Sequence, residues 1–173
     1  METIIPYIDH QRIESRCDEL VRALPITSDC NVISIEDGSK RFAYALVSRI
    51  GQGTTLIPIK IHTYAGTSST YRPRLNNADL LKLKKADYRK PTLLIDDICD
   101  SGHTLCSVQS LLPQNVITIV LLDKPGNHTC PVRLDHSGFE VPGSMFFVGY
   151  GMDYNGRYRD LDYIGVLSRE TQL

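Results

Sequence analysis

The stretch TLLIDDICDSGHTL (residues 92–105) decides the fold, because it leads a strand directly into acids, a glycine and hydroxyl side chains. Its first part, residues 92–96, is an apolar run that ends in acid, which is typical of a strand covered on both faces in a parallel sheet. Ligands of such sheets bind at the carboxyl ends of the strands. Asp96 and Asp97 are therefore predicted to lie at the binding edge of an α/β sheet.

Strands and helices alternate on both sides of this stretch. Apolar periodicity predicts strands at residues 31–35, 54–64, 92–96, 116–123 and 146–150, and helices at residues 8–23, 40–50 and 101–112. Pro58 places its strand near a sheet edge or at a bulge. Ser101 or Asp100 is expected to cap the last of these helices. The alternation predicts right-handed crossovers, a mostly parallel central sheet flanked by helices, and one domain over residues 1–173.

Two segments depart from the alternation. Residues 65–91 form a long excursion, and such a length indicates either a mobile lid or a disordered loop. Residues 125–173 are rich in glycine, proline and aromatic residues, and they predict a small hood rather than a second domain. The chain has no internal repeat and no low-complexity tract.

Composition limits the class of function. The 173 residues, 42% hydrophobic and 23% charged, suit one soluble α/β domain. A net charge of −1 with mixed signs offers no basic face for nucleic acid. No apolar run approaches the length of a membrane span, and no signal peptide is expected. Five cysteines without a CxxC pair fit neither a disulfide framework nor a zinc ribbon, which indicates a reducing cytoplasm.

The residues after Asp97 favour a phosphorylated ligand. In the turn DSGHT (100–104), backbone N–H groups and the following helix dipole point at one spot, and Gly102 permits close approach. Because carboxylates repel phosphate, a site with both groups needs ribose hydroxyls or a divalent metal between them. A phosphorylated sugar with Mg²⁺ satisfies all of these groups. The alternative is that the acids only cap a helix and a turn.

A resemblance narrows the class further. The segment IDDICDSGHTL (95–105) resembles the signature with which type I phosphoribosyltransferases bind phosphoribosyl pyrophosphate (PRPP). Three later segments resemble the hypoxanthine-guanine phosphoribosyltransferases in order and spacing, namely LLDKP (121–125), GFEVP (138–142) and FFVGYGMDYNGRYRDLDYIGVL (146–167). With SIEDGSKRFAYAL (34–46) and HTYAG (62–66), the resemblance extends from about residue 8 to residue 167.

The resemblance implies a fold and a reaction. The fold would be the type I phosphoribosyltransferase fold, with a hood formed by the C-terminal segment. The reaction would be Mg²⁺-dependent transfer of the 5-phosphoribosyl group from PRPP to N9 of hypoxanthine, guanine or another 6-oxopurine. IMP or GMP and pyrophosphate would be the products, in purine salvage. A homodimer or homotetramer is implied as well.

The resemblance assigns roles to the residues that bind PRPP. Asp96 and Asp97 would contact the ribose hydroxyls and hold Mg²⁺. Asp100 would act as general base and take the proton from purine N7. The cradle of the 5′-phosphate would comprise Asp100, Ser101, Gly102, His103 and Thr104.

Further roles concern the purine. Lys124 would donate to purine O6, and Phe146 would stack on the ring, with a surface lysine and a core phenylalanine as the alternatives. The backbone of Phe147 would meet the Watson–Crick edge of the base. Asp153 would border the purine and hold a second Mg²⁺ through water. These residues together would select 6-oxopurines.

The remaining roles concern pyrophosphate and closure. Arg159 would lie near pyrophosphate, and Thr63 and Tyr64 would belong to a loop that closes over the site. The pyrophosphate loop itself reads Glu36-Asp37-Gly38, where the family has a basic residue and two small ones. Two acids oppose a polyanion unless they face solvent or a metal. A non-catalytic sensor of PRPP or nucleotides is therefore the alternative to an enzyme, and an acceptor such as xanthine is a third possibility.

Overall fold

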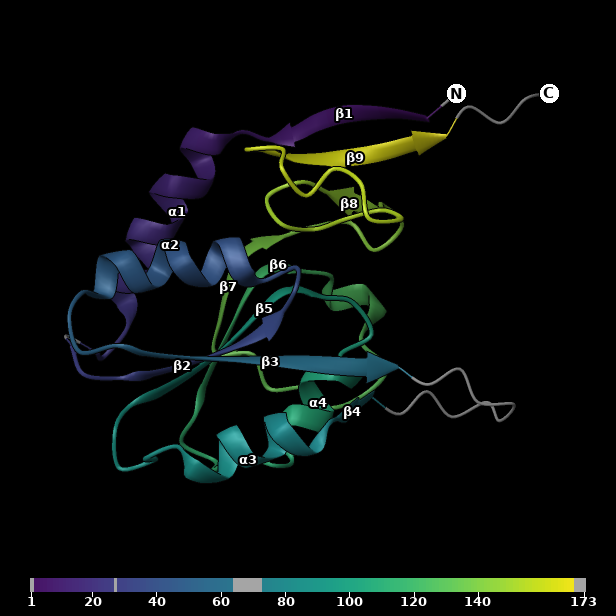
Figure 1. Cartoon of the computed structure of the whole chain (residues 1–173). Coiled ribbons are helices and arrows are strands. Elements are labelled where there is room, and N and C mark those ends of the chain that lie inside the picture. Colours follow the sequence, from purple (N-terminus) through teal and green to yellow (C-terminus); the bar gives the residue numbers. More distant parts are fainter. Residues whose placement is uncertain (1, 27, 64–72, 170–173) are drawn as a thin grey trace.

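The computed structural model describes residues 2–26, 28–63 and 73–169 of the chain (Figure 1). A six-stranded sheet carries helices on both faces, and a three-stranded sheet stands at one end of it. No helix in the described part of the chain has the length and apolar character that a membrane span requires.

The main sheet is mostly parallel, as predicted. Its strands lie in the order β4-β3-β2-β5-β6-β7. They are β2 (Asn31–Glu36), β3 (Thr55–Thr63), β4 (Pro73–Leu75), β5 (Thr92–Cys99), β6 (Ile117–Asp123) and β7 (His136–Glu140). Only β4 runs antiparallel to its neighbour. Because β5 lies inside this sheet, its carboxyl end opens onto the loops of both neighbouring strands.

Helices cover both faces of the sheet (Figure 1). They are α1 (His10–Ala23) and α2 (Lys40–Ile50) on one face, and α3 (Asn77–Lys85) and α4 (His103–Gln109) on the other. Leu93 and Ile95 of β5 belong to the core under α1 and α2, and Leu94 belongs to the core under α3 and α4. All three side chains are fully buried, which explains why this strand is apolar without alternation.

The hood is the three-stranded antiparallel sheet, which contains β1 (Glu2–Ile8), β8 (Phe147–Val148) and β9 (Ile164–Arg169) in the order β1-β9-β8. The sequence predicted a hood from residues 125–173 alone, but β1 pairs along β9 and completes it. The ring of Tyr7 on β1 meets the ring of Phe147 edge-on, with centroids 5.4 Å apart. The two ends of the described chain thus stabilise one another.

The structure corrects the predicted excursion and the predicted helix cap. The excursion at residues 65–91 is shorter than expected, because β4 and α3 occupy much of it. The lid was predicted at residues 65–91, and the first part of that range, residues 65–72, lies outside the described residues. The expected cap of α4 by Ser101 or Asp100 is wrong. Gly102 is the N-cap residue, with a left-handed φ of +83° and no side-chain hydrogen bond.

Pro58 lies near a sheet edge, as predicted. It pairs with Ser34 of β2 on one side, whereas β4 pairs only with residues 61–63 of β3 on the other side. The outer edge of β3 at Pro58 therefore needs no backbone N–H.

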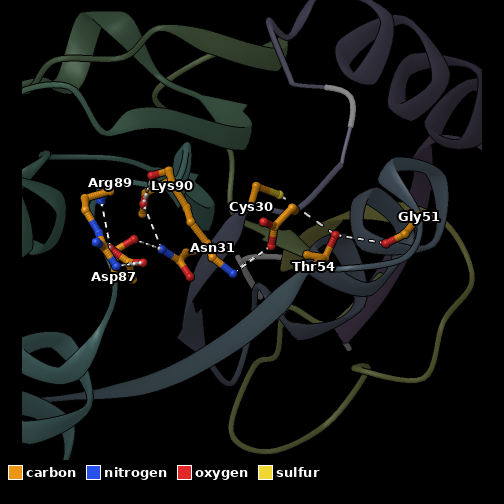
Figure 2. Close-up of polar contacts among 9 residues, drawn as sticks. Cys30, Asn31, Gly51, Thr54, Asp87, Arg89 and Lys90 are labelled. Atoms are coloured by element: carbon orange, nitrogen blue, oxygen red, sulfur yellow. Dashed lines mark hydrogen bonds and ion pairs between the residues drawn. The ribbon is translucent and has the colours of Figure 1, made fainter.

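Buried polar contacts fix the end of the sheet that lies opposite the carboxyl ends (Figure 2). The Asn31 side chain, 3% exposed, donates to Asp87 O at 2.9 Å and to Thr92 Oγ1 at 3.2 Å. Nearby, Thr54 Oγ1 donates to Gly51 O at 3.0 Å and contacts Cys30. Since these contacts anchor the loops at the amino ends of β2 and β5, the opposite edge is left to bind ligands.

Candidate active site

A cavity of about 300 Å³ lies at the carboxyl ends of β2 and β5. Its walls come from the end of β2, the end of β5 and the first turn of α4. The residues that line it include Glu36, Gly38, Asp96, Asp97, Asp100, Ser101, Gly102, His103 and Thr104. The structure thus gathers into one cavity the residues predicted for PRPP and most of those predicted for the pyrophosphate loop.

Asp96 and Asp97 form a pair of acids at the cavity floor. The Asp97 backbone N–H donates to Asp96 Oδ1 at 3.0 Å, and the Ile98 N–H donates to Asp97 Oδ1 at 2.9 Å. Burial raises the pKa of Asp96 well above its ordinary value, and the neighbouring Asp97 carboxylate raises it further. Burial also raises the pKa of Asp97. In the part of the chain that the structure describes, neither acid has an ion pair, so a cation or hydroxyl ligand would stabilise both.

Asp100 is held by two donors. Lys124 Nζ lies 2.8 Å from Asp100 Oδ2, and Asn127 Nδ2 lies 2.7 Å from Asp100 Oδ1. Burial raises the pKa of Asp100, but the hydrogen bonds from Lys124 and Asn127 outweigh burial, and the net shift is downward. Asp100 is therefore a carboxylate at neutral pH, as a general base must be.

Lys124 is a buried lysine rather than a surface one. It is 4% exposed, and its backbone N–H donates to Cys99 O at 2.9 Å. Its ammonium lies 5.8 Å from the centre of the Phe147 ring, which is itself buried. The structure thus places a positive charge beside Asp100, at the boundary between the cavity and the hood.

The acidic loop has a partner that the sequence did not reveal. Lys60 on β3 forms an ion pair with Asp37, with Nζ 2.9 Å from Oδ1, and the hydrogen bond from Lys60 lowers the pKa of Asp37. The Glu36–Asp37 peptide bond is cis. Gly38 packs so closely on Asp97 that an added Cβ would lie 1.8 Å from Oδ2. A side chain at this position would displace the Asp97 carboxylate, and part of the negative charge of the loop is offset by Lys60.

Arg159 and Asp153 form an ion pair, and the charge of Arg159 also lowers the pKa of Asp97, against the effect of burial. Arg159 Nη2 lies 2.7 Å from Asp153 Oδ1, and Nη1 donates to Gly151 O at 2.7 Å. Arg159 and Asp37 also line the same second cavity, which has a volume of about 570 Å³. This arrangement agrees with a site for anionic groups next to the acidic loop.

Two further predicted groups lie outside the 300 Å³ cavity. Phe146 is 48% exposed, meets the Tyr154 ring edge-on at 5.5 Å, and lines a separate hollow with Ile5 of β1. Thr63 ends β3, and Tyr64 lies outside the described residues. The stacking and lid roles of these residues stay predictions.

The sequence missed Asn127 as well as Lys60. Asn127 ends the short helix η1 (Pro125–Asn127), and its Nδ2 also donates to Gly143 O at 3.1 Å. It thereby connects Asp100 to the segment that leads into the hood. No motif marks this asparagine, because its contact depends on the turn of η1.

One group among the described residues has the spacing of metal ligands, but it is not the predicted one. Cys99, Asp123 and His128 offer ligand atoms within 4.8 Å of one another, whereas Asp96, Asp97 and Asp153 do not form such a group. Thiol and imidazole ligands suit metals other than Mg²⁺, which prefers oxygen ligands. This group therefore has no bearing on the magnesium prediction.

A parallel sheet with acids and a glycine turn at the carboxyl ends of its strands is typical of proteins that bind phosphorylated ligands at that edge. The chain matches the family model described as "Phosphoribosyl transferase domain" over residues 7–155. It therefore belongs to the phosphoribosyltransferase family, and it has the type I fold.

Individual relatives agree with this family. The chain is 34% identical over 144 residues to a hypoxanthine-guanine phosphoribosyltransferase of Lactococcus lactis, covering 81% of this chain and 76% of the relative. It is 32% identical over 173 residues to the hypoxanthine phosphoribosyltransferase of Escherichia coli K12, covering 94% of each. A crystal structure of a hypoxanthine phosphoribosyltransferase from Staphylococcus aureus is 27% identical, with a TM-score of 0.78 over 94% of this chain and 90% of the other.

Proposed function

We propose that this phosphoribosyltransferase transfers the 5-phosphoribosyl group from PRPP to N9 of a 6-oxopurine, hypoxanthine or guanine, in purine salvage. The observation that carries the proposal is the Lys124–Asp100 pair, with 2.8 Å between Nζ and Oδ2, beside the acid pair. The ammonium of Lys124 can donate to O6 and the carboxylate of Asp100 can accept from N7–H, because these two groups lie on the same edge of a 6-oxopurine. The names of the relatives support the same substrate class.

The pair changes partners when the purine binds. O6 takes the place of Asp100 Oδ2 as acceptor for the buried Lys124 ammonium. Asp100, released from that hydrogen bond, accepts the N7 proton while N9 attacks C1′ of the sugar. Asn127 keeps the carboxylate oriented through its bond to Oδ1. An exocyclic amino group, as in adenine, would face the ammonium with a donor, so adenine is rejected.

Magnesium fits the acid pair. Asp96 and Asp97 are oxygen ligands at the cavity floor, and without a cation their burial is unfavourable. The ion would be shared with PRPP and would neutralise charge on the leaving pyrophosphate. Asp153 is a further candidate ligand, and Arg159, which pairs with it, would help to bind the pyrophosphate.

The proposal is tested by product formation from PRPP with hypoxanthine, guanine, xanthine and adenine, each with Mg²⁺ and with EDTA. We expect IMP and GMP to form with Mg²⁺ only, and adenine to give no product. Turnover that EDTA does not affect would contradict the magnesium assignment. Preference for xanthine would favour the third possibility, and tight binding of PRPP without turnover of any base would favour the sensor.

The comparisons do not favour the sensor, since the relatives are named as transferases. The Lys60–Asp37 pair also weakens the main observation behind it, because the acidic loop is partly neutralised. We further propose a single domain, a cytoplasmic location, and a homodimer or homotetramer. Gel filtration with light scattering tests the last of these.

Lys60 is predicted to support PRPP binding through Asp37. Lys60→Met leaves the Asp37 carboxylate unpaired at the pyrophosphate loop, so the KM for PRPP is expected to rise about two- to fivefold, the size of an exposed ion pair. The rise should shrink at high salt, because salt screens exposed charges. Steady-state kinetics at low and high ionic strength measure both effects.

The double variant Lys60→Met/Asp37→Asn is the test of cause, since it should restore the KM for PRPP. Lys90→Met is the matched control, because Lys90 pairs with Asp29 at 2.7 Å at the opposite end of the sheet. If the double variant binds PRPP no better than Lys60→Met, charge on Asp37 is not the reason for the loss.

A further inference from the structure

The segment that follows η1 packs against the turn that precedes α4. We define residues 128–132 as the buttress segment. The Thr129 backbone N–H donates to Ser101 O at 3.0 Å, and Cys130 Sγ donates to the same oxygen at 3.6 Å. The Thr129 hydroxyl contacts His103 at 3.0 Å. The buttress segment thus supports the turn that is proposed to hold the 5′-phosphate.

Within this contact, two thiols lie unusually close. Cys106 Sγ on α4 lies 2.7 Å from Cys130 Sγ of the buttress segment, against about 2.05 Å in a disulfide bond. Both cysteines are free, and both are partly accessible. The other three cysteines, Cys17, Cys30 and Cys99, are at most 1% exposed. The geometry therefore singles out one pair among the five cysteines of the chain.

We propose that Cys106 and Cys130 form a reversible intrachain disulfide, produced by a peroxide or by a small-molecule disulfide, that weakens binding of the 5′-phosphate. The second part rests on the function proposed above. The first part does not, since it depends only on the two sulfurs and their accessibility.

The chemistry balances with either oxidant. When the oxidant is a peroxide and Cys130 reacts first, the Cys130 thiol becomes a sulfenic acid and water is released. Cys106 sulfur then attacks the Cys130 sulfur, the S–O bond breaks, and the departing hydroxide takes the Cys106 proton to form a second water. With a small disulfide, two exchange steps transfer the two thiol hydrogens to the oxidant and release two small thiols. A reducing cytoplasm would keep the pair reduced until such an oxidant accumulates.

Both sulfurs are partly accessible, so the oxidant can react with either of them first, and the other then closes the disulfide. Burial, together with the hydrogen bond to Cys130, raises the pKa of Cys106 to about 12, which slows its reaction with an outside partner. Its closeness to Cys130 compensates in the second step, which is intramolecular.

The effect on phosphate binding follows from the lost hydrogen. In the reduced chain, Cys106 can donate to Cys130 while Cys130 donates to Ser101 O. A disulfide sulfur has no proton, so Ser101 loses this contact. Gly102 packs closely on Cys130, since a Cβ added to Gly102 would lie only 3.1 Å from Cys130 Sγ. A shift of this sulfur on disulfide formation therefore alters the contact with Gly102 as well. The KM for PRPP is expected to rise about two- to fivefold on oxidation, as for loss of one weak hydrogen bond.

The experiment counts thiols in the unfolded chain before and after the folded full-length protein is treated with hydrogen peroxide or oxidised glutathione. We expect the count to fall from five to three, a peptide map that links Cys106 to Cys130, and full recovery with dithiothreitol. Non-reducing electrophoresis should show no covalent dimer. Five remaining thiols, or a different linked pair, would overturn the proposal, and this readout is independent of catalysis.

Variants and kinetics complete the test. Cys106→Ser and Cys130→Ser should each abolish the linked peptide, whereas Cys30→Ala, a change at a buried cysteine far from the pair, should leave it intact. For the wild type, the KM for PRPP is compared before oxidation, after oxidation and after reduction. An oxidised protein with an unchanged KM for PRPP would overturn the regulatory part. If the protein turns over no base at all, direct PRPP binding replaces the KM.

Discussion

Asp100→Asn is expected to lower kcat for hypoxanthine and guanine by roughly 10²–10⁴-fold, the range for loss of a general base. The amide has the same shape as the carboxylate, and its single oxygen can still accept from Lys124, which lies 2.8 Å away in the wild type, at the loss of the hydrogen bond from Asn127. The variant should therefore fold and bind PRPP with a KM near that of the wild type. Initial rates over a range of both substrates separate kcat from the two KM values.

The pH profile gives this prediction a second readout. The pKa of Asp100 is lowered, so kcat in the wild type should fall only at acidic pH, where the carboxylate gains a proton. The variant has no such proton to gain, and its residual rate should not show that acidic fall. Asp162→Asn, at an exposed aspartate, is the control and should behave as the wild type. A small loss of kcat, or an unchanged acidic fall in the variant, would mean that another group removes the N7 proton.

The central strand and its turn could be predicted because their signals are local. Continuous apolar residues in β5 mean that both faces are covered, and the acids and glycine that follow mark its carboxyl end. The residues predicted to bind PRPP accordingly line one cavity. The cap of α4 was predicted wrongly, because serine and aspartate are common caps and the sequence does not show that Gly102 adopts a left-handed conformation first.

Other features depend on contacts between distant parts of the chain. β1 was missed because it contains Pro6, leaves most of its residues exposed, and pairs with β9 at the other end of the sequence. The Lys60–Asp37 pair depends on the register of β2 and β3, in which Glu36 lies opposite Lys60. A sequence shows an acidic loop, whereas only the sheet register shows the cation beside it.

The same distinction applies to Asp100. Its proposed role rests on resemblance to a family motif, but its two donors come from the loop after β6, which lies more than twenty residues further along the chain. The family resemblance pointed to Lys124, which follows an apolar strand, whereas nothing in the sequence pointed to Asn127. The local sequence thus indicates which residues carry the chemistry, and tertiary contacts determine their protonation and orientation.

Lys124→Met is expected to lower kcat/KM for hypoxanthine and guanine by about 10–100-fold, since a hydrogen bond from a charged donor contributes roughly 1.5–3 kcal/mol. Methionine fills similar space beside the buried Phe147 ring, and Asp100 is exposed enough to be hydrated when its partner is removed. The variant should therefore fold, which circular dichroism and thermal unfolding can check. The KM for PRPP should change little.

Two consequences separate a role in base recognition from a general loss of activity. In the variant, the amino group of adenine no longer lies against the ammonium of Lys124, which is also a hydrogen-bond donor. The ratio of kcat/KM for hypoxanthine to kcat/KM for adenine should therefore fall. The acidic fall of kcat should also move to higher pH, because Lys124 holds down the pKa of Asp100. Lys90→Met removes a lysine–aspartate pair of similar length, 2.7 Å against 2.8 Å, far from the cavity, and it should change neither quantity. If Lys124→Met lowers activity equally with all bases and the acidic fall of kcat stays at the same pH, Lys124 stabilises the fold near Asp100 and does not distinguish one purine from another.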